Sequence, residues 1–358
     1  MTMASGHDVS GAGRAPGHRR PQAGARRQAQ PGHRDGLCSA SAHQAGPHPL
    51  GGSADVSVGR GAHRNPAGLS AVIAGAWRLA DWGWTPQQRL AWIEANLDLG
   101  VTSFDHADIY GGYSVEALFG EALALRPALR QRMQLVSKCG IRLVTPAQPG
   151  FLAPTQLKHY DTSAAHVRAS VEHSLQALRT DHLDLLLIHR PDALTDFDEL
   201  ADTFEALRRE GKLRCFGVSN FAPQQLAPLH RRVALATHQI ELSPLHLDAL
   251  HDGVLDQCQD LGLRPMIWSP LAGGRLFTGD DERARRVRQV LEAMSAELGV
   301  SSTTLAIAWV LRHPSQPLPI LGSRRIEVMR EALAAQALRL DAQQWWRIWS
   351  AASGHEVP

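Results

Sequence analysis

Four residues of the types that can reduce a carbonyl group stand at the ends of apolar runs or just after one. Asp105, Lys138 and His189 close such runs, and Tyr110 follows Asp105 by five positions. A tyrosine can donate a proton, a lysine can stabilise the phenolate, an aspartate can hold the lysine, and a histidine can bind the substrate oxygen. Only three lysines occur among the 37 basic residues, so a lysine that ends a strand-like run favours a specific role.

Taken singly, each of these residues has an ordinary structural explanation. An aspartate before a helix is usually a cap, a loop tyrosine usually packs, and a histidine at a strand end is usually a satisfied polar group. The case for chemistry depends on their occurring together, in order, at the ends of successive predicted strands.

The apolar runs alternate with amphipathic stretches, a rhythm that indicates parallel strands joined by helices. Strands are expected near residues 70–75, 101–105, 134–138, 183–189, 215–220, 236–239, 264–268 and 318–323. Helices are expected at residues 86–99, 114–125, 164–178, 198–210, 248–261, 284–298 and 326–337. Eight strands favour an α/β fold that is a single-domain (β/α)8 TIM barrel, with a doubly wound sheet as the second choice.

In such a barrel, the residues at the carboxyl ends of the strands meet at one mouth, where active sites are built. The long gaps at residues 140–161 and 271–280 each follow a predicted strand. Both are therefore candidate substrate loops, although tolerated surface insertions would look the same.

Residues 1–65 differ in composition from the rest of the chain. They are rich in Gly, Ala, Pro, Arg, His and Gln and hold eight Arg and three Asp, a net charge of +5. Such a segment buries too little apolar surface to offset its ordering entropy, so a disordered, basic, low-complexity tail is expected. The sequence does not decide between a basic arm that binds nucleic acid and a start codon placed too far upstream. Residues 66–358, with a net charge of −3, form the expected barrel and offer no basic stripe for nucleic acid.

Composition also limits the compartment and the cofactor. The four cysteines lie far apart without metal-ligand spacing, and no apolar stretch approaches a membrane span. A cytoplasmic protein with reduced thiols, no membrane partner and no metal is expected.

The chain resembles the aldo-keto reductase family, in its bacterial NADPH-dependent oxidoreductase branch, from about Leu69 to the C-terminus. Five motifs in the family's order carry the resemblance: Asp105-His-Ala-Asp-Ile-Tyr110-Gly, Val136-Ser-Lys138, Leu187-Ile-His189-Arg-Pro-Asp192, Gly217-Val-Ser-Asn220-Phe and Trp268-Ser-Pro-Leu271. The resemblance implies a barrel enzyme that reduces an aldehyde or ketone substrate.

By this resemblance, Tyr110 is the general acid, Lys138 lowers its pKa, Asp105 holds the lysine and His189 orients the carbonyl. The nicotinamide carboxamide is expected at Ser219, Asn220 and Gln239, with Trp268 stacked on the ring. Ser269, Leu271 and Gly273 would contact the pyrophosphate through their backbones.

The expected cofactor is NADPH. Ser323, Arg324 and Arg325 precede a predicted helix, and guanidinium groups at a helix N-terminus suit the 2′-phosphate. A Rossmann site has no support, because Gly11 and Gly13 in the tail are followed by Pro16 where a third glycine is needed. The family's Glu-Asn pair near the adenine is Glu331-Ala332 here.

Several alternatives remain open on the sequence alone. A catalytically silent, nucleotide-sensing regulatory barrel would keep the same fold. A metal-dependent barrel hydrolase is suggested by His106 and Asp108, but the HxH ligand pair is absent. Arg190 could meet an anionic substrate group, although an ion pair with Asp192 is the better expectation.

The substrate itself is not encoded in the motifs. An apolar mouth is expected, lined by Trp77, Trp82, Trp84 and Tyr113. A monomer or a weak homo-oligomer is expected.

Overall fold

The computed structural model describes residues 64–144 and 155–358. The expected tail lies outside this range except for its last two residues. Arg64 donates from its backbone N–H to Gly262 O at 2.9 Å, and the Asn65 side chain forms two hydrogen bonds with the Leu69 backbone. Hydrogen bonds therefore hold the described part of the chain from its first residue, Arg64.

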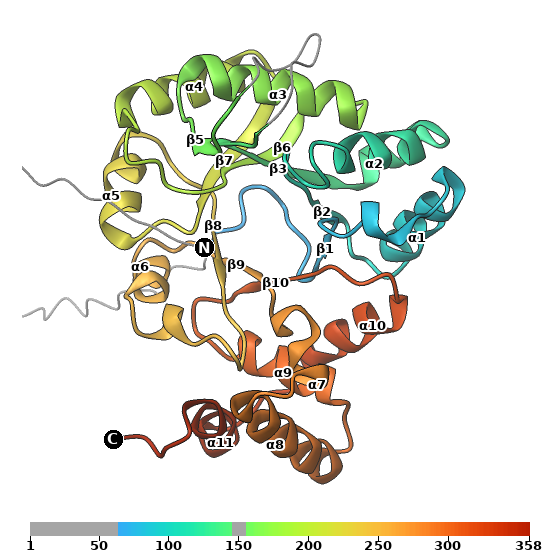
Figure 1. Ribbon diagram of the computed structural model, residues 1–358, viewed down its shortest axis with the longest axis vertical. Helices are drawn as coiled ribbons and strands as arrows, with labels where there is room; N and C mark the ends of the chain where they lie inside the picture. Colours follow the sequence, from blue (N-terminus) through green and yellow to red (C-terminus); the bar gives the residue numbers. More distant parts are fainter. Residues whose placement is uncertain (1–63, 145–154) are drawn as a thin grey trace, which may run out of the picture. The chain divides into compact units, whose positions relative to one another are not determined.

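Eight parallel strands close into a barrel, which confirms the predicted TIM-barrel fold (Figure 1). The strands are β1 (Ile73–Gly75), β2 (Ser103–Asp105), β3 (Gln134–Cys139), β6 (Leu183–Ile188), β7 (Leu213–Ser219), β8 (His238–Glu241), β9 (Met266–Trp268) and β10 (Leu318–Leu321). Around the barrel they run β1, β2, β3, β6, β7, β8, β9, β10 and back to β1.

The strand register brings the predicted polar residues to one end of the barrel. Asp105 is level with Gly75 and Val136, and Lys138 is level with Leu187, one residue before the end of β6. On the other side, Ser219 is level with Gln239. Because all strands are parallel, these carboxyl-terminal residues share the mouth where barrel enzymes carry their chemistry.

Helices surround the strands as the sequence pattern predicted, with the corrections that follow. The helices are α1 (Pro86–Asp98), α2 (Val115–Ala124), α3 (Ala164–Leu178), α4 (Phe197–Arg209), α5 (Pro223–Arg232), α6 (Val254–Asp260), α7 (Arg275–Thr278), α8 (Glu282–Leu298), α9 (Ser302–Leu311), α10 (Ile326–Ala334) and α11 (Ala342–Ser353).

The expected helix at residues 248–261 is broken in two. A 3-10 turn, η3 (Asp248–Leu250), precedes α6, and Gly253 between them has a φ of 81°, which ends one helical path before the next begins. The helix expected at residues 326–337 ends at Ala334 and continues as the 3-10 turn η5 (Ala335–Ala337).

The prediction missed α5 and α9, as well as the short α7 in the second long loop. α5 holds Pro223 and Pro228, which made the segment resemble a loop. α9 is buried along nearly its whole length and therefore lacks the polar face that marks an amphipathic helix.

The two long loops at the mouth contain short elements. Antiparallel strands β4 (Ile141–Arg142) and β5 (His159–Tyr160) form the base of the first loop, whose residues 145–154 lie outside the described range. The second loop contains the turn η4 (Ala272–Gly274) and α7. Two further 3-10 turns, η1 (Ala80–Trp82) and η2 (Pro127–Arg132), follow β1 and α2.

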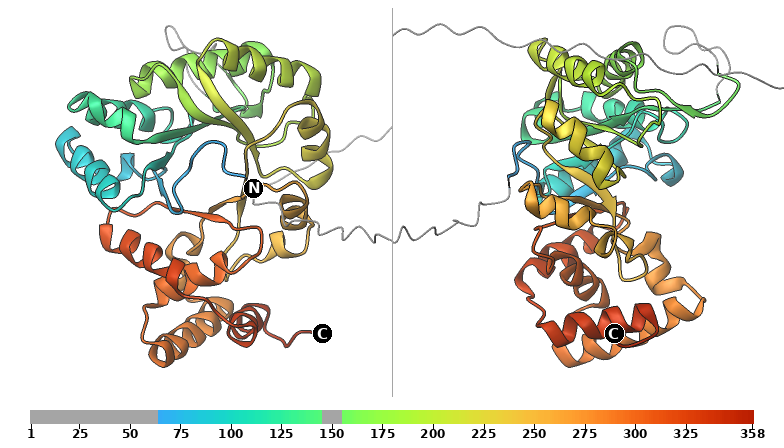
Figure 2. Two further views of the ribbon diagram at one scale, coloured as in Figure 1. Left: turned by 180° about the vertical axis from the view of Figure 1, so that it is seen from behind. Right: turned by 90° about the vertical axis from the view of Figure 1, so that its left-hand side faces the viewer.

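Helices α8 and α11 pack against each other at one side of the barrel, as the views in Figure 2 show. α11 is fastened by Trp345, whose ring stacks on Trp309 at 4.9 Å and 7°. The two indole N–H groups donate to each other's backbone carbonyls at 3.1 and 3.0 Å. Within the described chain, no single helix passes the length and hydropathy criteria for a membrane span; α8 and α9 pass only as a pair bent by 98°.

Candidate active site

Lys138 links three of the predicted residues at the barrel mouth. Its Nζ donates to Asp105 Oδ2 at 2.8 Å, to Tyr110 Oη at 3.0 Å and to the His106 carbonyl at 2.7 Å. The lysine and aspartate side chains are 1% and 5% exposed. All three N–H bonds of the ammonium are therefore used, and its position is fixed.

The turn after β2 presents Tyr110 to this lysine. Gly111, Gly112 and Tyr113 follow with φ values of 58°, 64° and 71°. Left-handed backbone is strained for a tyrosine, and outliers of this kind concentrate at functional sites. The Tyr113 hydroxyl accepts a hydrogen bond from Leu143 N at 3.0 Å, which ties this turn to the first long loop.

The fourth predicted residue, His189, lies against the tyrosine. The two rings are 5.9 Å apart at 77°, an edge-to-face contact. Nδ1 of His189 is buried without a hydrogen-bond partner among the described residues. Burial and the positive charges of Lys138 and Arg190 hold the pKa of His189 well below its usual range, so the ring is neutral at neutral pH.

The pKa of Tyr110 differs from the sequence-based expectation. Burial raises it above its ordinary value near 10, and Asp105 adds to the rise, while Lys138 opposes it through charge and a hydrogen bond. The lysine thus acts in the predicted direction, but desolvation outweighs it. Burial also disfavours the charge on Lys138, yet the Asp105 carboxylate and Tyr110 raise the pKa of the lysine overall.

Gln239, which was expected at the nicotinamide, contacts the tetrad formed by Asp105, Tyr110, Lys138 and His189. Its Nε2 donates to Asp105 Oδ1 at 2.8 Å, and the side chain is buried. One half of the amide is therefore committed to Asp105, which leaves Oε1 for any carboxamide.

The other three residues expected at the nicotinamide form a connected group. Asn220 donates from Nδ2 to Ser219 Oγ at 2.7 Å and to His189 O at 3.4 Å, and its Oδ1 accepts from Trp268 Nε1 at 3.0 Å. Asn220 has a φ of 59°. The structure brings Ser219, Asn220 and Trp268 together beside His189.

The expected pyrophosphate and 2′-phosphate residues lie on the next two loops. Ser269 and Ala272 have φ values of 51° and 50°, and a side chain built at Gly273 would approach only Arg78. Such turns expose backbone N–H groups, which suits an extended anion. The donor set thus fits a nicotinamide dinucleotide.

Ser323, Arg324 and Arg325 precede α10 as predicted. Both arginines are exposed, and neither takes part in an ion pair among the residues that the structure describes. Ser323 Oγ accepts from Arg325 N at 3.1 Å, and its carbonyl accepts from Trp92 Nε1 at 3.1 Å. Two free guanidinium groups at a helix N-terminus suit a phosphate.

A cavity of about 500 Å³ opens beside Asn220 and Trp268. Half of its other lining residues are polar or charged, namely Arg190, Gln224, Glu241, His246, Asp248 and Asp252. Arg190 lies over the Trp268 ring, with Cζ 5.9 Å from the ring centre. The ion pair expected with Asp192 is wrong: Asp192 accepts instead from Leu194 N at 2.9 Å and Thr162 Oγ1 at 3.5 Å.

The structure places the residues that were expected to line an apolar mouth in different surroundings. Trp77 is 58% exposed with Arg78 over its ring. Trp82 packs on Trp84 at 4.6 Å and on Trp92 at 5.4 Å, so it belongs to the barrel's packing. Tyr113 is half-buried beside the first long loop.

Two buried carboxyl groups lie next to the tetrad: Asp108, which the sequence suggested only as a metal ligand, and Glu116, which sequence reasoning missed. Asp108 and Glu116 are each 1% exposed. Glu116 shares a helix face with Phe119 and Leu123, and a charged residue on an apolar stripe was the signal that could have found it. His106 is fully buried and neutral, because burial and Lys138 lower its pKa to about 3. Within the described residues, no group of three or more His, Cys, Asp or Glu side chains could hold a metal ion.

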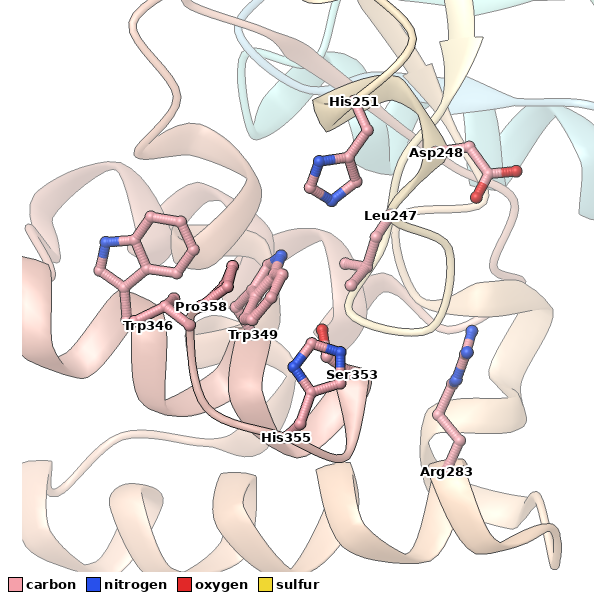
Figure 3. A pocket seen from close by; sticks show the side chains of 10 residues that line it. Leu247, Asp248, His251, Arg283, Trp346, Trp349, Ser353, His355 and Pro358 are labelled. Carbon is pink, nitrogen blue, oxygen red and sulfur yellow. The ribbon is translucent and has the colours of Figure 1, made fainter.

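A second cavity, of about 750 Å³, lies between α11 and the segment after β8 (Figure 3). Trp346 and Trp349 of α11 form one wall, and Leu247 and His251 form the other, as the close view shows. None of the four tetrad residues lines this cavity, and among the described residues Asp248 is the one lining residue that it shares with the cavity beside Asn220 and Trp268.

Comparison with known proteins assigns the family. Residues 71–352 match the model of the Aldo/keto reductase family. The chain is 52% identical over 293 residues to the oxidoreductase YdhF of Escherichia coli, which covers 81% of this chain and 96% of the relative. It is 43% identical over 292 residues to a 6-dehydroglucose reductase of Agrobacterium fabrum, again covering 81% and 96%.

A solved structure agrees with this assignment. The aldo/keto reductase of Klebsiella pneumoniae in complex with NADP and acetate matches with a TM-score of 0.63 and 27% identity, covering 78% of this chain and 90% of that one. With the family model covering most of the chain, the protein belongs to the aldo/keto reductase family and is an oxidoreductase.

Proposed function

We propose that this oxidoreductase uses NADPH to reduce an aldehyde or a ketone to an alcohol, with Tyr110 as the general acid. The observation that carries the proposal is the position of Lys138 Nζ, 3.0 Å from the Tyr110 hydroxyl and 2.8 Å from Asp105. Reduced nicotinamide, when bound, supplies the hydride that forms the new C–H bond. The side chains must hold the carbonyl group and deliver the proton.

Tyr110 gives its phenolic proton to the carbonyl oxygen as negative charge develops there. Its raised pKa keeps the proton on the phenol at neutral pH until that charge appears. The adjacent Lys138 ammonium then stabilises the phenolate, which regains a proton from solvent before the next turnover. Asp105 keeps the lysine charged and in place.

His189 orients the carbonyl group. A neutral imidazole whose ring edge faces Tyr110 can donate one hydrogen bond to the same oxygen that receives the proton. Two donors directed at one oxygen stabilise charge at the point where it develops.

The preference for NADPH over NADH rests on Arg324 and Arg325. Both are exposed and without ion pairs in the described chain, at the N-terminus of α10. They are thus available for the 2′-phosphate that distinguishes the two cofactors. The NADP bound to the Klebsiella pneumoniae relative supports this preference.

The cavity beside Asn220 and Trp268 supports a substrate class: none of the four tetrad residues lines it, but Asn220 on its wall donates to His189 O at 3.4 Å. Arg190 is a donor and Glu241 an acceptor on its wall, with further polar groups around them. A bound anion would satisfy Arg190 but oppose three carboxyl groups, and an apolar carbonyl would desolvate all of them. A carbonyl compound that carries hydroxyl groups matches both kinds of partner, and the relative named 6-dehydroglucose reductase supports this class.

The test is Tyr110→Phe, assayed by oxidation of NADPH with a panel of hydroxylated and apolar aldehydes. We expect turnover to fall by roughly 10²- to 10⁴-fold, while quenching of tryptophan fluorescence shows NADPH binding close to wild type. Tyr160→Phe, at a 44% exposed tyrosine, is the matched control and should keep full activity. Undiminished turnover in Tyr110→Phe would remove Tyr110 from this role. Wild-type protein that binds NADPH but reduces no aldehyde would support the silent regulatory barrel.

A further inference from the structure

Glu116 is a buried carboxyl group beside the tetrad that the proposed reaction does not use. Its Oε1 accepts a hydrogen bond from Ser137 Oγ at 2.5 Å, and its Oε2 accepts from Ser174 Oγ at 2.9 Å. Ser137 directly precedes Lys138 in β3, and Ser174 lies on α3. The carboxyl group therefore joins three elements, α2, β3 and α3, at the level of the catalytic lysine.

Close packing of α2 on α3 makes this contact possible. Gly120 follows Glu116 by one helical turn, and a Cβ built there would lie 2.0 Å from the Ala177 carbonyl oxygen. Only a glycine allows the helices to approach so closely. The short distance brings the first turn of α2 within reach of Ser174.

The charged and titratable groups that face Glu116 are few. The turn before α2 contributes Asp108, whose backbone N–H donates to Lys138 O at 3.0 Å. Strand β3 contributes Lys138 and Cys139, and α3 contributes the hydroxyl groups of Ser170 and Ser174. Lys138 is the one positive charge in this set.

We propose that Glu116 acts on Lys138 through its charge, from the opposite face of β3, and that this charge sets how readily Tyr110 releases its proton. An ionised Glu116 places a second carboxylate, besides Asp105, in the field of the lysine. The ammonium then stabilises the Tyr110 phenolate less, and proton donation slows. A neutral Glu116 leaves the full field of Lys138 on the phenol. The inference rests on Tyr110 acting as the general acid.

The ionisation falls in the working range of an enzyme. Burial raises the pKa of Glu116 to about 7, although the hydroxyl groups of Ser137 and Ser174 and the charge of Lys138 oppose the rise. Burial and the nearby Glu116 charge raise the pKa of Asp108 well above its usual value. Glu116 therefore gains its charge as the pH passes neutrality, and carbonyl reduction should slow over the same interval.

The experiment compares the pH profile of kcat for NADPH-dependent reduction in the wild type, Glu116→Gln and Ser174→Ala. In the wild type we expect kcat to fall roughly three- to tenfold between about pH 6 and pH 8. Glu116→Gln should lose this fall while it keeps the wild-type kcat at the acidic end. Ser174→Ala removes a donor that favours the ionised form, so the midpoint of the fall should move to higher pH.

A purely structural role predicts something else. Glu116→Gln would then lower kcat by one factor at every pH, and Ser174→Ala would leave the midpoint unchanged. Either result overturns the proposal. If Glu116→Gln does not fold, the midpoint in Ser174→Ala decides alone, since a serine-to-alanine change in a helix is mild.

The ionisation can also be followed without turnover. Asp108 also has a raised pKa and contributes an infrared carboxyl band of its own to both proteins, so the band of Glu116 is taken as the difference between wild type and Glu116→Gln. This difference band of a protonated, buried carboxyl group should disappear between about pH 6 and pH 8. Persistence of that band to alkaline pH would contradict the proposal. Full activity of Tyr110→Phe would instead refute the proposed acid, a result that the infrared measurement does not affect.

Discussion

Gln239 Nε2 donates a hydrogen bond to Asp105 Oδ1 at 2.8 Å across the mouth of the barrel. The two residues lie on β8 and β2, which are on opposite sides of the closed sheet. Asp105 accepts from Gln239 with one oxygen and from Lys138 with the other. The carboxylate that holds the lysine is thus itself held from the far side of the barrel, at the strand expected to receive the nicotinamide.

Gln239→Leu should therefore impair catalysis as well as cofactor binding. Loss of a hydrogen bond to a charged group costs about 1.5–3 kcal/mol, so we expect kcat to fall roughly 10- to 100-fold at saturating NADPH. Single-turnover NADPH oxidation measures this step. If Gln239 serves only the nicotinamide carboxamide, the Kd for NADPH will rise while kcat remains at the wild-type value.

The strand ends could be predicted from the sequence, but links between them could not. Asp105, Lys138 and His189 each close an apolar run, and in a parallel barrel such residues converge whatever the loops do. The bond between Asp105 and Gln239 joins strands 134 residues apart. A contact between residues so far apart leaves no periodic pattern in the sequence. The resemblance to the family predicted only a cofactor-binding role for Gln239.

Missed elements have a similar physical origin. α5 was obscured by its prolines and α9 by its burial on all sides, since both remove the polar and apolar alternation that marks a helix. The net rise in the pKa of Tyr110 also required the structure, because desolvation depends on packing while the identity of the neighbouring lysine does not.

Lys138→Met should destabilise the fold as well as abolish reduction. The Lys138–Asp105 pair is buried, with side chains 1% and 5% exposed. Removing one partner of such a pair leaves an uncompensated charge and costs about 3–5 kcal/mol. Urea unfolding of the variant measures this loss.

The double variant Asp105→Asn/Lys138→Met separates the two effects. With both charges removed, we expect most of the free energy of unfolding to return, while reduction stays absent. A double variant as unstable as Lys138→Met would show that packing of the lysine stem, rather than the buried charge on Asp105, limits stability.

Arg324→Ala should weaken NADPH binding without affecting NADH. Loss of a charge-assisted contact to the 2′-phosphate raises the Kd for NADPH by roughly 10- to 100-fold, as measured by fluorescence titration. Arg330→Ala is the matched control, because Arg330 lies on α10, just after Arg324 in the chain, and pairs with Glu327 at 3.6 Å. Equal weakening of both nucleotides would place Arg324 away from the 2′-phosphate.

His106→Leu should make the protein more resistant to acid. Burial and the charge of Lys138 lower the pKa of His106 to about 3, whereas the unfolded chain binds the proton near pH 6.5. Stability from the neutral ring is therefore complete above about pH 6.5 and is lost as the pH falls toward 3. Glu116 has the opposite sign, since its raised pKa favours the folded state at low pH and that contribution is lost on approaching pH 7. Glu116 contributes equally to His106→Leu and to the wild type, so its effect cancels when their free energies of unfolding are compared at the same pH.

Between about pH 7 and pH 5, the wild type should lose about 2 kcal/mol through His106 that the leucine variant keeps. Urea unfolding at the two pH values measures this change, and any packing cost of leucine against Phe119, which lies 4.5 Å from the His106 ring, cancels because it is independent of pH. His355→Leu, at an exposed histidine, should follow the wild type. A stability difference between His106→Leu and wild type that is equal at both pH values would mean that His106 titrates in the folded protein as it does in the unfolded chain, and that its ring is charged at pH 5. That result would place a second positive charge beside Lys138 and make Tyr110 a stronger acid than its burial indicates.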